Sequence, residues 1–331
     1  MELHEELEAA HEKCLLGLNG SLHKEGPPLY HYTSISSCLS IIETGKLFLT
    51  DVRYLNDPNE ISNGLEIFNS AYNELASEFT SKSQKYFLKF INIIRIGLNV
   101  TLSFRSEGEK FLSALTSKEE DIELKKYAEI FSPKNKPENK NIYIASFSED
   151  KDNLRQWMPY ASDGKGLSIG FEGISNNMHA ICQYDIIKVC YETDDNKKNY
   201  VKNLLKDLFL IFDRCAREGT LSTNQDLFID SFWIAFMFDI IACKTPEYKD
   251  EKEWRLVVVT TQESEKGRIK YRVTQDIIKP YLEISIEKKS IKEIILGPKA
   301  ENTLNQNSLQ SVLHHKEYKD VHIGTSVIKY R

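Results

Sequence analysis

The sequence contains little of the residues that mark fibrous or disordered chains. Its 331 residues include only 15 glycines and 9 prolines, and hydrophobic residues make up 41%. This composition excludes a collagen-like chain and does not fit intrinsic disorder. The length and the apolar fraction predict an ordinary globular protein with one large domain or two closely packed ones.

The cysteines lack the spacing that structural zinc or a disulfide framework requires. There are six, with no CxxC pair and no histidine at zinc-finger distance. His314 and His315 are adjacent, so on a helix they point to different faces and cannot share a metal. We therefore expect reduced thiols in the core and no bound metal.

Neither a strong positive charge nor a membrane span is evident. Lys and Arg number 43 against 49 Asp and Glu, so only the lysine-rich stretch 133–140 speaks for nucleic-acid binding. Residues 86–104 form the most apolar long stretch, but Lys89 and Arg95 interrupt it, which predicts a buried helix. The acidic N-terminus does not resemble a secretory signal, and we expect a cytoplasmic protein without a membrane partner.

The order of predicted elements indicates an α+β fold with a mixed β-sheet core. Residues 29–50 show the pattern of strand, helix and strand, with Gly45 ending the helix. Helical periodicity covers 2–18, 61–131, 197–217, 225–243 and 300–314. Further strands are predicted at 142–148, 167–172, 253–261, 281–286, 292–297 and 320–330. We expect a helical lead at 1–28 and one domain at 29–331, with helical insertions near 61–131 and 197–243.

The first candidate binding segment surrounds His31. Side chains alternate along a strand, so His31 and Thr33 should lie on one side and Tyr32 on the other. An imidazole and a hydroxyl that point together can hold a ribose diol. The structural alternative is a core or capping histidine, with Thr33 or Ser34 as the cap of the next helix.

Two further segments are open to both a structural and a functional interpretation. Asn56 and Asp57 are polar enough for a site, but Asp57 also suits the cap of a helix. Trp157 and Tyr160 lie three apart on a predicted helical face, with Arg155 nearby. Aromatic residues at that spacing form either a core contact or a stacking platform.

The sharpest cluster of charge is at residues 251–257. In an extended chain, Glu251, Glu253 and Arg255 share one face and Trp254 faces the core. Such a face is either a solvated charge ladder or a site in which Arg255 keeps a carboxylate ionised next to a developing cation. The sequence leaves both open.

These motifs, in this order, resemble a bacterial and archaeal family of domains of unknown function, number 2971 in its series. The resemblance runs from about Tyr30 to Arg331. Its motifs here are HYTS, NDPNE, SFS, WMPYA with a KG turn, EWR, GP and the C-terminal YR. The sequence departs from the family pattern at Leu55, where members usually have phenylalanine, at Asn59, where they have an aromatic residue, and at Lys249-Asp250.

A second and weaker resemblance is to ADP-ribosyltransferases. It rests on the His-Tyr-Thr strand, the helix and Gly-x-Leu strand that follow, and an acid at the start of a late strand. It implies an ADP-ribosyltransferase-like fold in which His31 and Thr33 hold a ribose of NAD. Trp157 or Tyr160 would then stack on nicotinamide.

The same resemblance implies that Glu253 stabilises an oxocarbenium-like charge and that Glu251 orients the acceptor. The predicted catalytic pair is Glu251 and Glu253. The predicted cofactor-binding set is His31, Tyr32, Thr33, Asn56, Asp57, Arg155, Trp157, Tyr160 and Arg255.

The function expected from these resemblances is an NAD-consuming, ADP-ribosyltransferase-like enzyme of intracellular toxin or defence type, with an unknown target. An alternative is a binding module that senses a nucleotide or an ADP-ribose derivative without turnover. A third is a nucleic-acid-processing or nucleic-acid-binding protein, which only the lysine-rich stretch favours.

Overall fold

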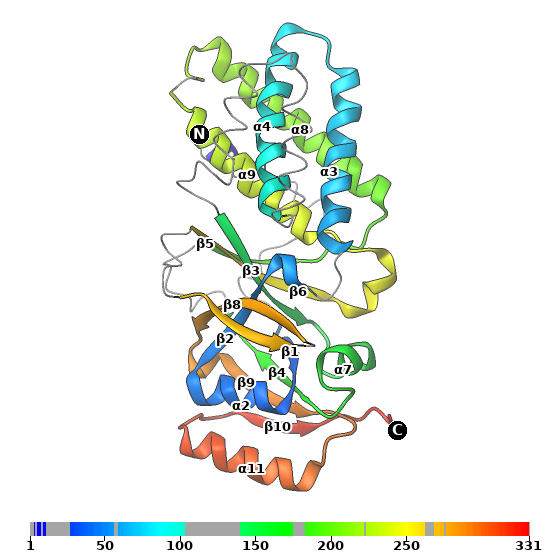
Figure 1. Cartoon of the computed structure of the whole chain (residues 1–331), viewed down its shortest axis with the longest axis vertical. Helices are drawn as coiled ribbons and strands as arrows, with labels where there is room; N and C mark the ends of the chain where they lie inside the picture. The colour runs from blue at the N-terminus through cyan, green and yellow to red at the C-terminus, as the bar shows by residue number, and fades with distance from the viewer. Residues whose placement is uncertain are drawn as a thin grey trace.

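A mixed sheet of ten strands runs through the middle of the molecule, and helices cover both of its faces (Figure 1). The computed structural model describes residues 3, 5–7, 9–10, 27–55, 59–102, 140–174, 183–221, 223–261, 268–274 and 276–330. Strand β9 pairs in parallel with β10, whereas the other strand pairs are antiparallel. The fold is therefore α+β, as the order of predicted elements indicates.

The strands follow the order β10-β9-β4-β1-β3-β2-β8-β7, and β6 joins the sheet between β3 and β5. Their bounds are β1 Leu29–Thr33, β2 Lys46–Asp51, β3 Lys140–Ser148, β4 Leu167–Phe171, β5 Gln183–Lys188, β6 Glu253–Thr261, β7 Lys270–Thr274, β8 Ile277–Ser285, β9 Ile291–Leu296 and β10 His322–Thr325. The helices are α2 Ile35–Thr44, α3 Asn59–Glu78, α4 Lys82–Leu102, α7 Leu154–Tyr160, α8 Asp194–Arg217, α9 Gln225–Ala242 and α11 Asn302–His315, and the short 3-10 turns are η1 Val52–Tyr54, η3 Pro246–Glu251 and η4 Lys288–Ser290.

The sheet opens along one edge of β3, and this opening positions the site described below. On its other edge, β3 pairs with β6 from one end to the other. On the edge that opens, β1 pairs with β3 only between Tyr30 and Ser148, and β2 pairs with β3 only at Ile144 and Tyr143. Residues 145–147 of β3 therefore face a gap between β1 and β2 in the strand pairing.

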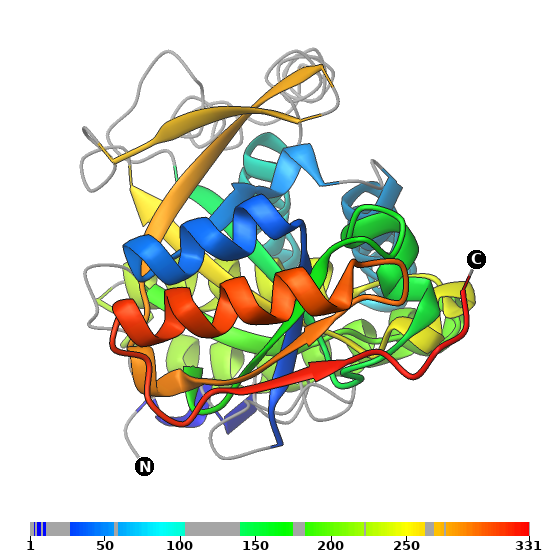
Figure 2. The same ribbon diagram turned by 90° about the horizontal axis from the view of Figure 1, so that it is seen from below.

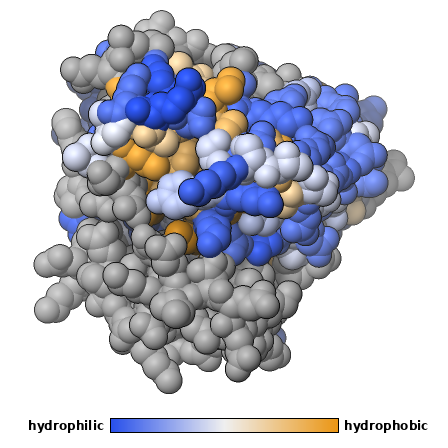
Figure 3. Space-filling model, turned by 90° about the horizontal axis from the view of Figure 1, so that it is seen from above, coloured by the Kyte–Doolittle hydropathy of each residue, from blue (hydrophilic) through white to orange (hydrophobic). Residues whose placement is uncertain are grey.

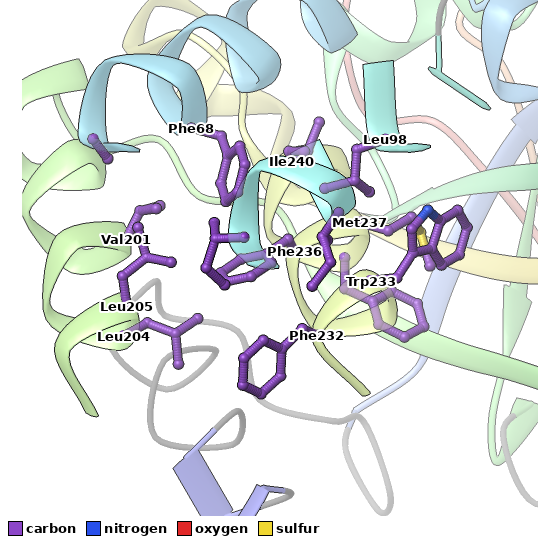
Figure 4. Close-up of a cluster of buried hydrophobic side chains, with 14 of the residues drawn as sticks. Phe68, Leu98, Val201, Leu204, Leu205, Phe232, Trp233, Phe236, Met237 and Ile240 are labelled. Carbon is purple, nitrogen blue, oxygen red and sulfur yellow. The ribbon is translucent and has the colours of Figure 1, made fainter. Parts of the chain in front are cut away.

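The helices α3, α4, α8 and α9 pack together on one side of the sheet (Figure 1). Two of them lie between β2 and β3 in the sequence and two between β5 and β6, so the described parts of both predicted helical insertions form one layer. Phe68, Phe232 and Phe236 lie at its centre (Figure 4). Helix α9 is buried nearly all round, as its composition predicts. Seen from this end, hydrophilic side chains cover much of the described surface and hydrophobic ones gather in one area (Figure 3).

Helices α2 and α11 lie across the opposite side of the sheet (Figure 2). Cys38, Ile41 and Ile42 of α2 pack with Leu309 of α11 in the core beneath the sheet. Helix α2 ends at Gly45, whose φ of 63° is left-handed and whose N–H donates to the carbonyl of Ile41, so the expected C-cap is confirmed. The strand, helix and strand predicted for residues 29–50 are thus all present.

Two predicted strands, β8 and β10, differ from their expected bounds by four or more residues, and two strands, β5 and β7, are not predicted. Strand β8 begins at Ile277 rather than residue 281, because it pairs with β7 through residues 277–281, whereas it pairs with β2 only from Tyr281 onward. Strand β10 stops at Thr325 rather than residue 330, because the chain leaves β9 there. Strand β7 has only five residues, most of them exposed, and the alternation of polar and apolar residues in β5 breaks at the adjacent Ile186 and Ile187.

Helix α4 contains most of the apolar stretch 86–104, and Phe87, Ile91 and Leu98 on it are fully buried. The expectation of a buried helix is confirmed for its described part. No helix among the described residues has the length and apolarity needed to span a bilayer. Residues 132–139 and most of the predicted lead helix 2–18 lie outside the described residues.

Candidate functional site

A cavity of about 330 Å³ lies at the opening between β1 and β2. Its walls come from β1 and the start of α2, from β2 and η1, from residues 144–147 of β3, and from α7. The junction of η3 with β6 and the β7–β8 hairpin complete it. Its size suits a small molecule, and its lining mixes hydroxyls, aromatic rings and both signs of charge.

His31 lies at the gap in the strand pairing. Its Nδ1 donates to the backbone carbonyl of Ser146 at 2.9 Å, and its ring lies 5.7 Å from that of Phe147. Burial lowers the pKa of His31 below 6.5; the bond to Ser146 opposes this shift, whereas the charge of Arg272 adds to it. Because a carbonyl only accepts, the neutral ring carries its proton on Nδ1, and Nε2 is a hydrogen-bond acceptor.

The two interpretations of the first segment prove compatible. Ser34 caps α2, since its hydroxyl accepts from the backbone N–H of Ser37 at 3.1 Å. His31, Tyr32 and Thr33 line the cavity, and the ring of Tyr32 packs edge-on against that of Trp157, with the ring centroids 4.7 Å apart. The rings alternate as expected, in that His31 lies against Phe147 and Tyr32 against Trp157, but Tyr32 lines the same cavity as its two neighbours.

Glu251 and Glu253 line the cavity on the side of η3 and β6. Lys244 joins them: its Nζ lies 2.6 Å from Glu251 Oε2 and 2.9 Å from Glu253 Oε2. Arg255 donates from Nε to Glu253 Oε1 at 2.9 Å and from Nη2 to Oε2 at 3.0 Å. The exposed fractions are 6% for Glu251, 5% for Glu253, 3% for Lys244 and 0% for Arg255. A solvated charge ladder is therefore excluded.

The geometry of this cluster differs from the predicted strand face. Only Glu253 and Arg255 share the face of β6, because Glu251 ends the 3-10 turn η3 and Lys252 follows with a left-handed φ of 44°. Glu251 meets Glu253 through Lys244 rather than by strand alternation. Lys244, which follows α9 along the chain, was missed because nothing in its local sequence marks it as buried.

The cluster contains two carboxylates and two cationic side chains, so its formal net charge is zero. Burial alone would raise the pKa of Glu253, but the charges and hydrogen bonds of Arg255 and Lys244 outweigh burial and lower it to about 2. The Glu253 carboxylate is therefore ionised at neutral pH. Both of its oxygens already accept hydrogen bonds from protein donors.

Two cations of the β7–β8 hairpin, Arg272 and Lys279, also line the cavity. Arg272 Nη2 donates to the hydroxyl of Thr50 at 2.8 Å, and Lys279 Nζ donates to the carbonyl of Tyr54 at 2.9 Å. Burial lowers the pKa of both groups, and the charge of Arg272 lowers that of Lys279 further. Neither was predicted, because β7 was missed and charged residues in a polar hairpin are usually solvated.

The structure separates three predicted residues from the cavity. Trp157 is fully buried and its Nε1 donates to Asp152 Oδ1 at 2.7 Å, so it belongs to a core between β1 and α7. The side chain of Arg155 is 63% exposed and lies 3.2 Å from that of Asp250. Arg255 lies behind Glu253 and donates to the carbonyl of Ile241 at 2.6 Å.

The remaining predicted residues divide between the cavity and the residues outside the described part. Tyr32 and Tyr160 line the cavity and Trp157 does not, while Tyr54, which was not predicted, lines it as well. Asn56 and Asp57 lie outside the described residues. The expected convergence of distant motifs in one site thus holds for His31 and Glu253.

No group of three or more His, Cys, Asp or Glu side chains in the described ranges is arranged to hold a metal ion. Cys38, Cys190, Cys215 and Cys243 are buried free thiols, as expected, while Cys14 and Cys182 fall outside these ranges. Burial raises the pKa of Cys38 and of Cys243 to about 12, so neither supplies a thiolate at neutral pH.

Comparison with curated proteins and with solved structures finds no match. Residues 156–256 match the model of a family described as "Protein of unknown function (DUF2971)". This segment runs from α7 to β6 and contains Tyr160, Lys244, Glu251 and Glu253. The resemblance to this family that the motifs predict is thereby confirmed over residues 156–256.

Proposed function

We propose that the protein is an ADP-ribosyltransferase-like enzyme that binds and consumes NAD in this cavity. One observation carries the proposal: His31 and Thr33 line the same cavity as Glu251 and Glu253, which lie far from them in the sequence. The resemblance to ADP-ribosyltransferases predicts that these residues act on one ligand. Their meeting in one cavity supports that prediction.

The polar groups of the cavity suit a ribose. The unprotonated Nε2 of His31 accepts a hydrogen bond from one hydroxyl, and the Thr33 hydroxyl both donates and accepts. The rings of Tyr54 and Tyr160 in the lining offer stacking faces for a planar base. In this proposal, the ribose lies next to β1 and the base against an aromatic wall.

The acids act on the reacting carbon. The bond between the ribose carbon C1′ and the nicotinamide nitrogen breaks, and its electron pair leaves with nicotinamide. The positive charge that develops on the ribose is stabilised by Glu253, which is ionised at neutral pH. The acceptor nucleophile, which Glu251 orients, then bonds to C1′ and releases its proton to solvent.

A non-catalytic binding module is the second candidate, and a specific observation favours it. Arg255 and Lys244 already engage both oxygens of Glu253, and the cluster has no formal net charge. Such a carboxylate attracts a developing cation less strongly than an unpaired one. The third alternative, nucleic-acid binding, rests on residues 133–140, of which only Lys140 lies within the described ranges.

The decisive experiment incubates purified protein with NAD, alone and with cell extract, and measures nicotinamide release. Calorimetric titration with ADP-ribose runs in parallel. Nicotinamide release above a heat-denatured control supports the enzyme, and labelled ADP-ribose on an extract component identifies the acceptor. ADP-ribose binding without release supports the binding module. Absence of both release and binding contradicts both candidates.

Growth arrest on expression, compared with a Glu253→Gln variant, tests the toxin or defence role.

A further inference from the structure

Arg272 and Lys279 lie directly opposite each other on adjacent strands of the hairpin. Like charges in that register destabilise a sheet, because their side chains stand only about 5 Å apart at the Cβ atoms. Lys279 is only 7% exposed, so solvent does little to screen the pair. An anion bound in the cavity next to these two cations would offset the repulsion between them.

The surroundings of Arg272 support this interpretation. The guanidinium donates to the Thr50 hydroxyl and lies over the ring of Tyr281 at 5.6 Å, and both of these groups are neutral. Its Nε is buried and has no acceptor in the described part of the chain. A buried N–H donor without an acceptor is destabilising, and a bound anion would satisfy it.

The charges around the cavity differ between its two sides. Next to β6, Lys244 and Arg255 balance Glu251 and Glu253. Arg272 and Lys279 add two positive charges on the hairpin side. These six groups therefore carry a net charge of about +2 by formal count, which favours an anionic ligand whose negative charge lies at the hairpin.

We propose that Arg272 and Lys279 form a phosphate-binding subsite, and that the cavity binds a nucleotide with its phosphates at the hairpin and a ribose at His31. A guanidinium fork and a lysine point charge are the groups that recognise phosphate oxygens. The inference rests on the nucleotide of the proposed function and assigns its phosphate end. It does not require turnover.

The test measures binding to the full chain of ADP-ribose, ADP and inorganic pyrophosphate, with uncharged adenosine for comparison. Arg272→Gln should weaken ADP-ribose binding about tenfold to hundredfold, as expected for a lost charge-assisted hydrogen bond. Adenosine binding should stay unchanged. Lys270→Gln is the matched control, because Lys270 lies on the same strand and pairs with Glu283 at 2.8 Å without lining the cavity.

A second measurement covers the case in which Arg272→Gln does not fold. In the wild-type protein, pyrophosphate should raise the melting temperature and compete with ADP-ribose, and both effects should weaken with salt. Binding of ADP-ribose by folded Arg272→Gln at wild-type affinity overturns the subsite. So does a wild-type protein that binds adenosine as tightly as ADP, or that binds neither. If ADP-ribose binding depends on Arg272 but NAD is not cleaved, the result supports the subsite and contradicts the proposed enzyme. If NAD is cleaved and its KM is unchanged in Arg272→Gln, the result contradicts the subsite but not the enzyme.

Discussion

The indole of Trp157 donates its hydrogen to Oδ1 of Asp152 at 2.7 Å. The same carboxylate accepts from the Ser326 hydroxyl at 2.6 Å and from the backbone N–H of Val327 at 2.8 Å. Asp152 therefore ties the buried indole of α7 to the segment that follows β10. The tryptophan of the WMPYA motif serves this junction, while Tyr160, one turn later, reaches the cavity.

We predict that Asp152→Ala lowers the free energy of unfolding by about 1–3 kcal/mol, because it leaves the buried indole N–H without an acceptor. It should also speed proteolysis of the chain after β10. Urea unfolding and timed proteolysis measure the two effects. Ser326→Ala removes only one donor to Asp152 and should have the smaller effect. Equal losses in the two variants would contradict the anchoring role.

Trp157→Phe should reduce stability and leave ligand binding per folded molecule unchanged, since Trp157 does not line the cavity. Tyr160→Leu, which removes a ring from the cavity wall, should weaken binding of ADP-ribose with little change in stability. Calorimetric affinities and urea midpoints of the two variants separate these roles. Weaker ADP-ribose binding by Trp157→Phe, with unchanged binding by Tyr160→Leu, would indicate that Trp157 contacts the ligand.

Lys244 is predicted to be the most sensitive member of the charged cluster. Lys244→Met leaves Glu251 and Glu253 buried with only Arg255 as a cation, and such a change typically destabilises by about 3–5 kcal/mol. Lys252→Met is the control: Lys252 pairs with Asp150 at 3.0 Å, but its side chain is 49% exposed, so the loss should stay below about 1 kcal/mol. Urea unfolding at neutral pH compares them. Similar losses in the two variants would contradict this prediction, because they would show that removing Lys244 leaves no uncompensated buried charge.

His31 should make stability depend on pH below about 6.5. Its pKa in the folded state is lowered by burial and by Arg272, so the unfolded chain takes up the proton first as pH falls. The contribution of the neutral ring is complete above the unfolded pKa and declines below it. We expect the stability difference between wild type and His31→Asn to shrink between pH 7.5 and pH 5.5 in urea titrations. A difference independent of pH would contradict the neutral state of His31.

Local patterns in the sequence predict the elements that surround His31. A polar cap, apolar positions at helical spacing and a glycine specify α2 within residues 34–45, and the strands on either side follow from alternation. The burial of Trp157 agrees with one of the two interpretations of its spacing. These features depend on neighbours within a few residues, so a single sequence contains enough information to predict them.

The charged half of the site is not predictable in this way. Lys244 contacts Glu253 because the end of α9 lies close to the start of β6. Arg272 lines the cavity because its strand, β7, pairs with β8, which in turn pairs with β2. Both contacts depend on tertiary packing between segments whose lysines and arginines look like ordinary surface residues. The left-handed turn at Lys252, which ends the expected strand face, likewise gives no signal in the sequence.

The role of Glu253 separates the enzyme from the binding module. Glu253→Gln keeps the shape of the side chain but removes its charge, so Lys244 and Arg255 retain only Glu251 as an acid. Stability should therefore fall in any case, because the residue is buried. If the carboxylate stabilises the developing charge on the ribose, kcat for NAD cleavage per folded molecule should also fall about 10²–10³-fold. Binding of ADP-ribose should change far less.

Glu251→Gln is the matched control, since it removes the same charge from the same cluster and loses its ion pair with Lys244. A structural role for both acids predicts similar losses of stability and no change in cleavage per folded molecule. A catalytic role for Glu253 predicts similar losses of stability but a much larger loss of kcat in Glu253→Gln. Cleavage of saturating NAD, normalised to the folded fraction from urea curves, distinguishes these outcomes. Undiminished cleavage by folded Glu253→Gln would remove this carboxylate from the mechanism.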